Sequence, residues 1–230
     1  MKKPKILVIC GPTATGKSDL AVELALERNG EVISADSRQV YKGMDVGSGK
    51  ITKKEMRGIP HHLLDVISPK KVFSVSDYQE LATLKINEIL SRGKLPIICG
   101  GTGFYIESIV DGIVLPEVKP NKELRKKLEK ESAESLFKKL QKRDPKRAKE
   151  IDIHNKVRII RAIEIAEELG KVPKVKKIQK YDTEIIGLDT DDANLKERIN
   201  KRLVKRIPGI IKEIKKLRET GLSWKRLESF

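Results

Sequence analysis

The sequence predicts an α/β protein in which a core built on a parallel sheet carries a helical insertion. Over the first 115 residues, short apolar runs typical of buried parallel strands alternate with stretches of helical spacing. Charged helical segments follow, and an apolar run at residues 184–189 then predicts a strand that returns to the sheet before a long basic helix. We therefore expect residues 1–115 and 183–230 to form the core and residues 116–182 to form the inserted helical domain.

The first apolar run leads directly into a phosphate-binding loop. Residues 6–10 (Ile-Leu-Val-Ile-Cys) precede a complete GxxxxGKS pattern. Its glycines let backbone N–H groups converge on phosphate oxygens, Lys17 adds a point charge, and the Ser18 hydroxyl can hold Mg²⁺. The apolar spacing of residues 19–25 predicts a helix whose N-terminal dipole favours anions. The loop predicts a P-loop NTPase-like core that binds a phosphate chain, and its residues are Gly11, Pro12, Thr13, Ala14, Thr15, Gly16, Lys17 and Ser18.

Two further strand ends are expected to lie beside this loop. The β-prone run at residues 31–35 delivers Asp36, and the run at residues 95–99 ends in Gly-Gly-Thr-Gly at residues 100–103. In a parallel sheet these carboxyl ends form the edge where ligands bind. Asp36 could accept a proton from a nucleophile or lie close to Mg²⁺. The glycine turn stands where many ATP-hydrolysing P-loop enzymes have an Asp, which weakens the interpretation as an NTPase.

Five blocks, in this order, resemble the tRNA dimethylallyltransferase (isopentenyltransferase) family. The blocks are residues 11–18 (GPTATGKS), 36–47 (DSRQVYKGMDVG), 58–65 (GIPHHLLD), 100–105 (GGTGFY) and 155–162 (NKVRIIRA). The resemblance implies transfer of a dimethylallyl group from dimethylallyl diphosphate to N6 of the adenosine on the 3′ side of a tRNA anticodon, with Mg²⁺ as cofactor. Members of the family usually continue through further helices, whereas this chain ends at Phe230.

The resemblance also implies roles for single residues. Lys17, with Mg²⁺ on Ser18, would stabilise the diphosphate leaving group. Asp36 would act as the base, in preference to a metal role, and Thr102 would orient the amine. Arg202, in an R-I-x-x-R helix, would reach the diphosphate. The residues implied in tRNA binding are Asp36, Ser37, Arg38, Gln39, Thr102, Arg125, Val157, Arg158, Ile159, Ile160 and Arg161.

The charge distribution agrees with a polyanionic partner. The net charge is +16, and it is uneven, because residues 1–115 hold 16 Lys and Arg against 13 Asp and Glu while residues 116–230 hold 33 against 20. A basic half beside a near-neutral half suggests a partner larger than a small substrate.

The longest apolar runs are too short to span a membrane, and the chain enters its first strand soon after Met1. We therefore expect a cytoplasmic protein. We also expect it to act as a monomer.

Three patterns are predicted to be structural. Residues 47–50 (Gly-Ser-Gly-Lys) look like a second phosphate loop but lack its leading glycine and its hydroxyl, so we expect a flexible turn. His61 and His62 are adjacent and no third metal ligand follows at a recognised spacing. Cys10 and Cys99 also lack metal-ligand spacing and are expected in the core.

Three other functions share part of this pattern. A nucleotide isopentenyltransferase acting on AMP, ADP or ATP would share the loop, Asp36 and Thr102, but would not need the basic second half. A small-molecule kinase would bind ATP in the same loop. A non-catalytic RNA-binding fragment would bind tRNA without transferring a prenyl group.

Overall fold

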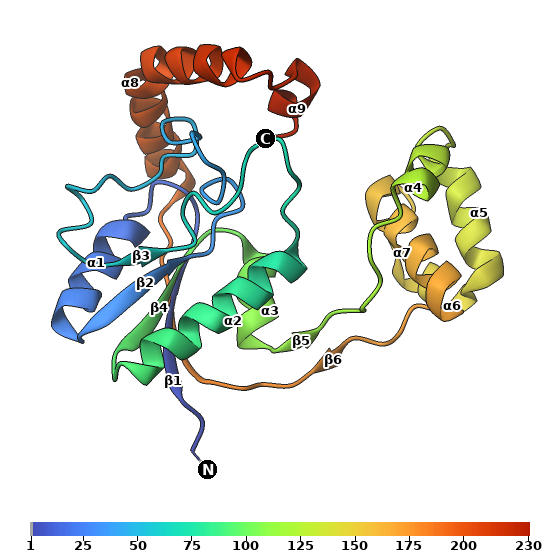
Figure 1. The fold of residues 1–230 in the computed structure, drawn as a ribbon, viewed down its shortest axis with the longest axis horizontal. Coiled ribbons are helices and arrows are strands. Elements are labelled where there is room, and N and C mark those ends of the chain that lie inside the picture. The colour runs from blue at the N-terminus through green and yellow to red at the C-terminus, as the bar shows by residue number, and fades with distance from the viewer. Residues whose placement is uncertain (1) are drawn as a thin grey trace. The chain divides into compact units, whose positions relative to one another are not determined.

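The computed structural model describes residues 2–230 and divides into two compact units (Figure 1). One unit contains the residues up to Ile113 together with Lys177–Phe230, and the other contains Val114–Lys176. The second junction therefore lies before the expected one at residue 183. The reason is Tyr181, whose ring is buried among apolar side chains of the first unit.

The first unit is built on a five-stranded parallel sheet, which confirms the predicted fold class. The strand order is β3-β2-β4-β1-β7, and all four pairings are parallel. The strands are β1 (Lys5–Cys10), β2 (Gly30–Ser34), β3 (His61–His62), β4 (Leu95–Gly100) and β7 (Asp182–Gly187). The predicted returning strand is thus β7, at the edge beside β1. Because all strands run the same way, the loops that follow β1, β2 and β4 open at one edge.

Helices cover both faces of this sheet (Figure 1). The helices of this unit are α1 (Lys17–Glu27), α2 (Val75–Ser91), α3 (Gly103–Val110), α8 (Asp192–Glu219) and α9 (Trp224–Glu228). Successive side chains of β1 point to opposite faces, so Leu7 and Ile9 pack against α1 whereas Ile6 and Val8 pack against α2 and α3. Burial on both faces explains why the strands are apolar along their length.

The second unit consists of four helices. They are α4 (Lys122–Leu128), α5 (Ala133–Arg143), α6 (Pro145–Glu150) and α7 (Lys156–Leu169). Asn155 caps α7 by accepting a hydrogen bond from the Arg158 N–H at 3.1 Å, and Gly170 ends it with φ of 77°, as the sequence predicts. The charged stretch after Asn121 forms two helices because Ser132 caps a new one. Short strands β5 (Ile113–Val114) and β6 (Lys176–Lys177) pair where the chain passes between units.

A buried carboxylate on β2 couples the stability of the first unit to pH. Glu31 is 3% exposed, and its carboxylate accepts hydrogen bonds from Lys94 at 2.9 Å and from His62 and Arg92 at 2.7 Å each. Burial alone would raise the pKa of Glu31, but these three donors outweigh burial and hold it at about 2, below its usual 4.5. Because the folded pKa lies below the unfolded one, the stabilisation is complete above pH 4.5 and is lost as the pH falls toward 2.

We expect Glu31→Gln to lower the free energy of unfolding at pH 7 by about 3 kcal/mol, the value that corresponds to this pKa shift. Urea unfolding between pH 7 and pH 3 measures it. Wild-type stability should fall below pH 4.5, and the variant should show a shallower fall. Glu80→Gln, at an exposed position on α2, is the matched control. Equal pH dependence in wild type and Glu31→Gln would contradict this account.

Candidate functional site

The loop between β1 and α1 has the backbone that an anion site needs. Gly11, Ala14 and Gly16 have positive φ angles of 145°, 63° and 91°. A side chain on Gly11 would overlap the carbonyl oxygen of Leu188, the residue that follows β7, so only glycine fits at position 11. Gly16 then caps α1 in the left-handed region, and the free N–H groups of the first helical turn are left for a ligand.

Lys17 lies over this loop and shares its surroundings with two other charged groups. Its ammonium donates to the carbonyl oxygen of Pro12, which also accepts from the Thr15 hydroxyl at 2.9 Å. Loss of solvent lowers the pKa of Lys17, the carboxylate of Asp36 opposes that change, and the charge of Arg202 adds to it. The structure therefore brings the predicted Lys17, Asp36 and Arg202 into one electrostatic neighbourhood.

The loops that follow β2 and β4 are joined to each other beside the phosphate-binding loop. The Thr102 N–H donates to the Ala35 carbonyl oxygen at 3.0 Å, and the Ser37 N–H donates to Thr102 Oγ1 at the same distance. A side chain on Gly100 would overlap the backbone of Ala35, and a Cβ on Gly101 would lie 3.5 Å from the Gly11 carbonyl oxygen. The glycines thus allow three loops to meet at the carboxyl edge of the sheet.

Asp36 is fixed by the turn that it begins. Its Oδ1 accepts hydrogen bonds from the backbone N–H groups of Arg38 at 2.8 Å and Gln39 at 3.3 Å. Such a turn orients the carboxylate without using both of its oxygens. Within residues 2–230, Oδ2 accepts no side-chain or backbone hydrogen bond. One oxygen is therefore held and the other is available for a proton or a bound ligand.

The polar residues after Asp36 differ in their surroundings. Arg38 is exposed, and its guanidinium donates to the Ser229 carbonyl oxygen at 3.3 Å and lies 5.8 Å from the centre of the Phe230 ring. Gln39 is turned toward β2, where its Oε1 accepts from the Ser34 hydroxyl at 3.2 Å. Of these side chains, that of Arg38 is the more accessible to a large ligand.

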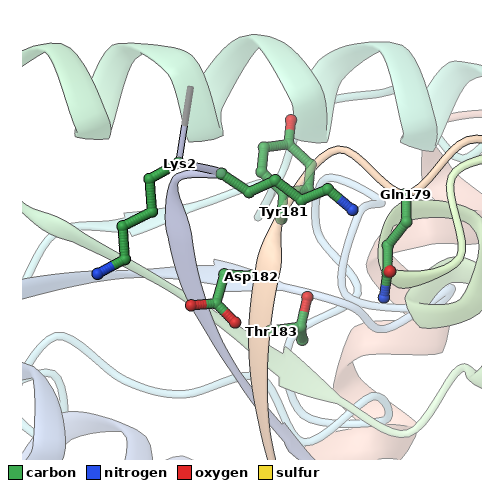
Figure 2. Close-up of a pocket in the computed structure, with 6 residues that line it drawn as sticks. Lys2, Gln179, Tyr181, Asp182 and Thr183 are labelled. Atoms are coloured by element: carbon green, nitrogen blue, oxygen red, sulfur yellow. The ribbon is translucent and has the colours of Figure 1, made fainter.

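Two cavities of the first unit differ in their relation to this edge. A cavity of about 20 Å³, enough for one water molecule, is lined in part by Ser18, Gln39 and His61. A larger cavity of about 340 Å³ lies at the amino ends of β1 and β7 (Figure 2). It is lined by Lys2, Lys3, Gln179, Tyr181, Asp182 and Thr183. Because ligands of parallel sheets bind at the carboxyl ends, the larger cavity is not the candidate site.

The two histidines have hydrogen-bond partners within the protein, as expected for residues with a structural role. His61 Nδ1 lies 2.9 Å from the Ile59 carbonyl oxygen, and burial lowers the pKa of its imidazole. His62 Nε2 is hydrogen-bonded to the Glu31 carboxylate at 2.7 Å. Cys99 is buried, and burial raises its thiol pKa to about 12. In the part of the chain that the structure describes, no three His, Cys, Asp or Glu side chains are grouped as metal ligands.

The turn at residues 47–50, which the sequence predicts to be flexible, is held by hydrogen bonds of Lys50. Lys50 Nζ donates to the Tyr41 carbonyl oxygen at 3.0 Å and to carboxylates of Asp45 at 2.6 Å and Asp65 at 2.7 Å. Its side chain is 6% exposed. Lys50 therefore stabilises the turn, and its ammonium is already paired with these three oxygens.

The helical unit separates the predicted RNA-binding residues into two kinds. Arg158 is exposed, and Val157 is 79% exposed at the start of α7. Arg125 and Arg161 instead pair with the buried Glu164, whose carboxylate lies 2.6 Å from the first and 3.1 Å from the second guanidinium. These two arginines bind the unit together, a role that the sequence analysis did not assign.

Two further residues predicted to bind tRNA are core residues. Ile159 is fully buried and Ile160 is 6% exposed, and both pack in the hydrophobic core of the helical unit. Helical periodicity explains this, because Arg158 lies on the outer face of α7 while the next two residues turn inward. The side chains of Ile159 and Ile160 therefore support the helix, and a part of these residues in tRNA binding stays a prediction.

No helix among the described residues is both long and apolar enough to cross a membrane.

The family model described as IPP transferase matches residues 39–229. The tRNA dimethylallyltransferase of Anoxybacillus flavithermus is 43% identical over 224 residues, which cover 95% of this chain and 72% of that protein.

Two solved structures are similar in fold as well as in sequence. The tRNA isopentenylpyrophosphate transferase of Bacillus halodurans matches with a TM-score of 0.69 and 42% identity, covering 96% of this chain and 72% of that one. A eukaryotic dimethylallyltransferase acting on tRNA matches with a TM-score of 0.83 and 30% identity, covering 94% of this chain and 56% of that one. On these matches and the five sequence blocks, the chain belongs to the IPP transferase family, that of the tRNA dimethylallyltransferases.

Proposed function

We propose that this chain transfers a dimethylallyl group from dimethylallyl diphosphate to N6 of the adenosine on the 3′ side of the anticodon in tRNA. The observation that carries the proposal is the meeting of the phosphate-binding loop, Asp36 and Thr102 at one edge of the sheet. A donor bound there would have its diphosphate on the loop and its allyl carbon toward the Asp36 and Thr102 turns.

The donor side of the reaction needs positive charge. Breaking the allylic C–O bond leaves negative charge on diphosphate, which Lys17, Arg202 and the amino end of α1 would stabilise. A bound Mg²⁺ would supply further positive charge to the leaving group. Ser18 fits as a residue that holds the ion, because it is exposed in the first turn of α1 beside Lys17.

The acceptor side needs a base. As the N6 nitrogen forms its bond to the allyl carbon, the C–O bond breaks and a proton leaves the nitrogen. The free Oδ2 of Asp36 would accept that proton. Thr102 would orient the amine: its oxygen already accepts from Ser37, and its hydroxyl proton remains available to donate. The adenosine must leave the RNA stack to reach this edge.

The exposed end of α7 supports tRNA as the acceptor, and Arg158 and Arg161 should respond differently to substitution. Arg158→Ala should weaken binding across tRNA species and lower the salt slope by about one, because a phosphate contact carries no sequence information. Arg161→Ala should instead lower the free energy of unfolding by about 1 to 2 kcal/mol. This substitution leaves the buried Glu164 carboxylate with one partner fewer. The loss is expected to be moderate because the Arg161 side chain is itself a third exposed.

Filter binding at several salt concentrations and urea unfolding measure the two effects. Lys146→Ala, on the neighbouring α6, removes one exposed charge and serves as the control for unspecific loss of positive charge. Unchanged tRNA affinity and salt slope in Arg158→Ala would remove the support that α7 gives to an RNA partner.

Incubation with labelled dimethylallyl diphosphate and Mg²⁺, with either unmodified tRNA or AMP as acceptor, tests the function. The proposal predicts label in tRNA adenosine and none in AMP. Label in AMP would favour a nucleotide isopentenyltransferase, ATP consumption without the donor would favour a kinase, and tRNA binding without transfer would favour an RNA-binding fragment.

We also propose that the enzyme acts as a monomer in the cytoplasm, which sizing chromatography and cell fractionation would check.

A further inference from the structure

The turn at residues 45–47, which leads into the segment that resembles a second phosphate loop, binds an anion that the protein itself supplies. The N–H groups of Asp45 and Val46 each donate to Glu213 Oε2 at 2.7 Å, and the Gly47 N–H donates to Oε1 at 3.0 Å. Three consecutive N–H groups that converge on one carboxylate form the kind of concave backbone that also binds phosphate. The anion held at this turn is therefore the Glu213 side chain of α8.

Close packing beside this contact fixes α8 against the turn. A Cβ on Gly209 would lie 2.9 Å from a methyl carbon of Val46, and a side chain on Gly49 would overlap the guanidinium of Arg206. Gly49 also has a φ of 65°, which favours glycine. In Figure 1, α8 changes direction along its length, as expected for a helix with Pro208 inside it. The contacts to the turn lie on either side of that proline.

The face of α8 that touches the turn also includes Arg202. Residues 202, 206, 209 and 213 are separated by four, three and four positions, a spacing that keeps side chains on one helix face. At the far end of this face, the charge of Arg202 is near enough to lower the pKa of Lys17. Pro208 bends the helix between Arg202 and Glu213. Because Arg206 and Gly209 pack against the same turn between these two residues, a shift of α8 at Glu213 would be passed on to Arg202.

We propose that Glu213 is a positioning residue, whose hydrogen bonds to the turn at residues 45–47 hold α8 where Arg202 faces the diphosphate. Glu213 itself touches no ligand and acts through Arg202. The inference rests on the proposed function in one respect, that a diphosphate is the ligand of the phosphate-binding loop.

A double-mutant cycle with inorganic pyrophosphate and Mg²⁺ as the probe tests this positioning. Glu213→Ala and Arg202→Ala should each weaken pyrophosphate binding about 10-fold, as expected for loss of one charged contact. The double variant should bind no more weakly than the weaker single variant, because both substitutions remove the same contact. The KM for dimethylallyl diphosphate should rise in parallel, while tRNA affinity stays unchanged. Glu219→Ala, an exposed position on the same helix, is the matched control.

Glu213→Gln distinguishes positioning from simple loss of structure and replaces Glu213→Ala if that variant does not fold. Its single side-chain oxygen can still accept from the N–H groups of Asp45 and Val46, while the Gly47 N–H loses its acceptor, so this variant should bind pyrophosphate more tightly than Glu213→Ala. Losses that multiply to about 100-fold in the double variant would overturn the inference. So would wild-type pyrophosphate binding in Glu213→Ala. A wild-type chain that binds no pyrophosphate would overturn the proposed function itself, and the inference with it.

Discussion

Lys17→Ala should lower the rate of prenyl transfer to tRNA by a factor of about 10² to 10³, corresponding to about 3 to 4 kcal/mol of transition-state stabilisation. The ammonium of Lys17 lies over the phosphate-binding loop, where it would meet the charge that develops on the leaving diphosphate. Since that charge is largest in the transition state, the loss should be mainly in kcat. The affinity for tRNA should be unchanged, because the loop is not part of the proposed RNA surface.

Single-turnover transfer with saturating donor measures the effect, and filter binding measures tRNA affinity. Lys53→Ala removes the same charge from an exposed loop of the same unit and is the control. Near wild-type transfer by Lys17→Ala would mean that this loop does not hold the diphosphate. A loss of tRNA affinity as large as the loss of rate would place the loop in the RNA surface instead.

Asp36→Asn should lower the rate by about 10²- to 10⁴-fold, the range expected for loss of a general base. The amide keeps one oxygen that can accept from the N–H groups of Arg38 and Gln39, so the turn should be retained. The variant therefore removes basicity and changes the local structure little. The affinity for dimethylallyl diphosphate should change little, because the free Oδ2 is assigned to the amine.

Donor affinity and transfer rate, measured over a range of Mg²⁺ concentrations, separate the two roles of Asp36. A base predicts a slow variant whose donor affinity and rate do not respond to added metal. Weakened donor binding that high Mg²⁺ restores would contradict the base role and would assign Asp36 to the metal.

Local patterns in the sequence were enough to predict most of the core. The phosphate-binding loop, the parallel strands and the Asn155 cap each depend on residues close together in the chain, so their spacing carries the information. The same holds for the returning strand β7, whose apolar run is visible in the sequence although its place beside β1 is set by the sheet.

Long-range partners could not be predicted in this way. Arg125 looks like a free RNA-binding cation until the fold brings it to Glu164 on α7. Residues 47–50 look like a flexible turn until Glu213, far along the chain, supplies the anion that binds their neighbours. In each case the composition shows a charge, and only the tertiary structure shows whether that charge is already neutralised.

Transfer of label to a single nucleoside tests the central claim most directly. The chain is incubated with labelled dimethylallyl diphosphate, Mg²⁺ and one of two tRNA transcripts, which differ only in having adenosine or guanosine on the 3′ side of the anticodon. After digestion, nucleosides are identified by mass. The account predicts dimethylallyl on N6 of that adenosine and no label in the guanosine transcript. Equal labelling of both transcripts, or none in either, would contradict it.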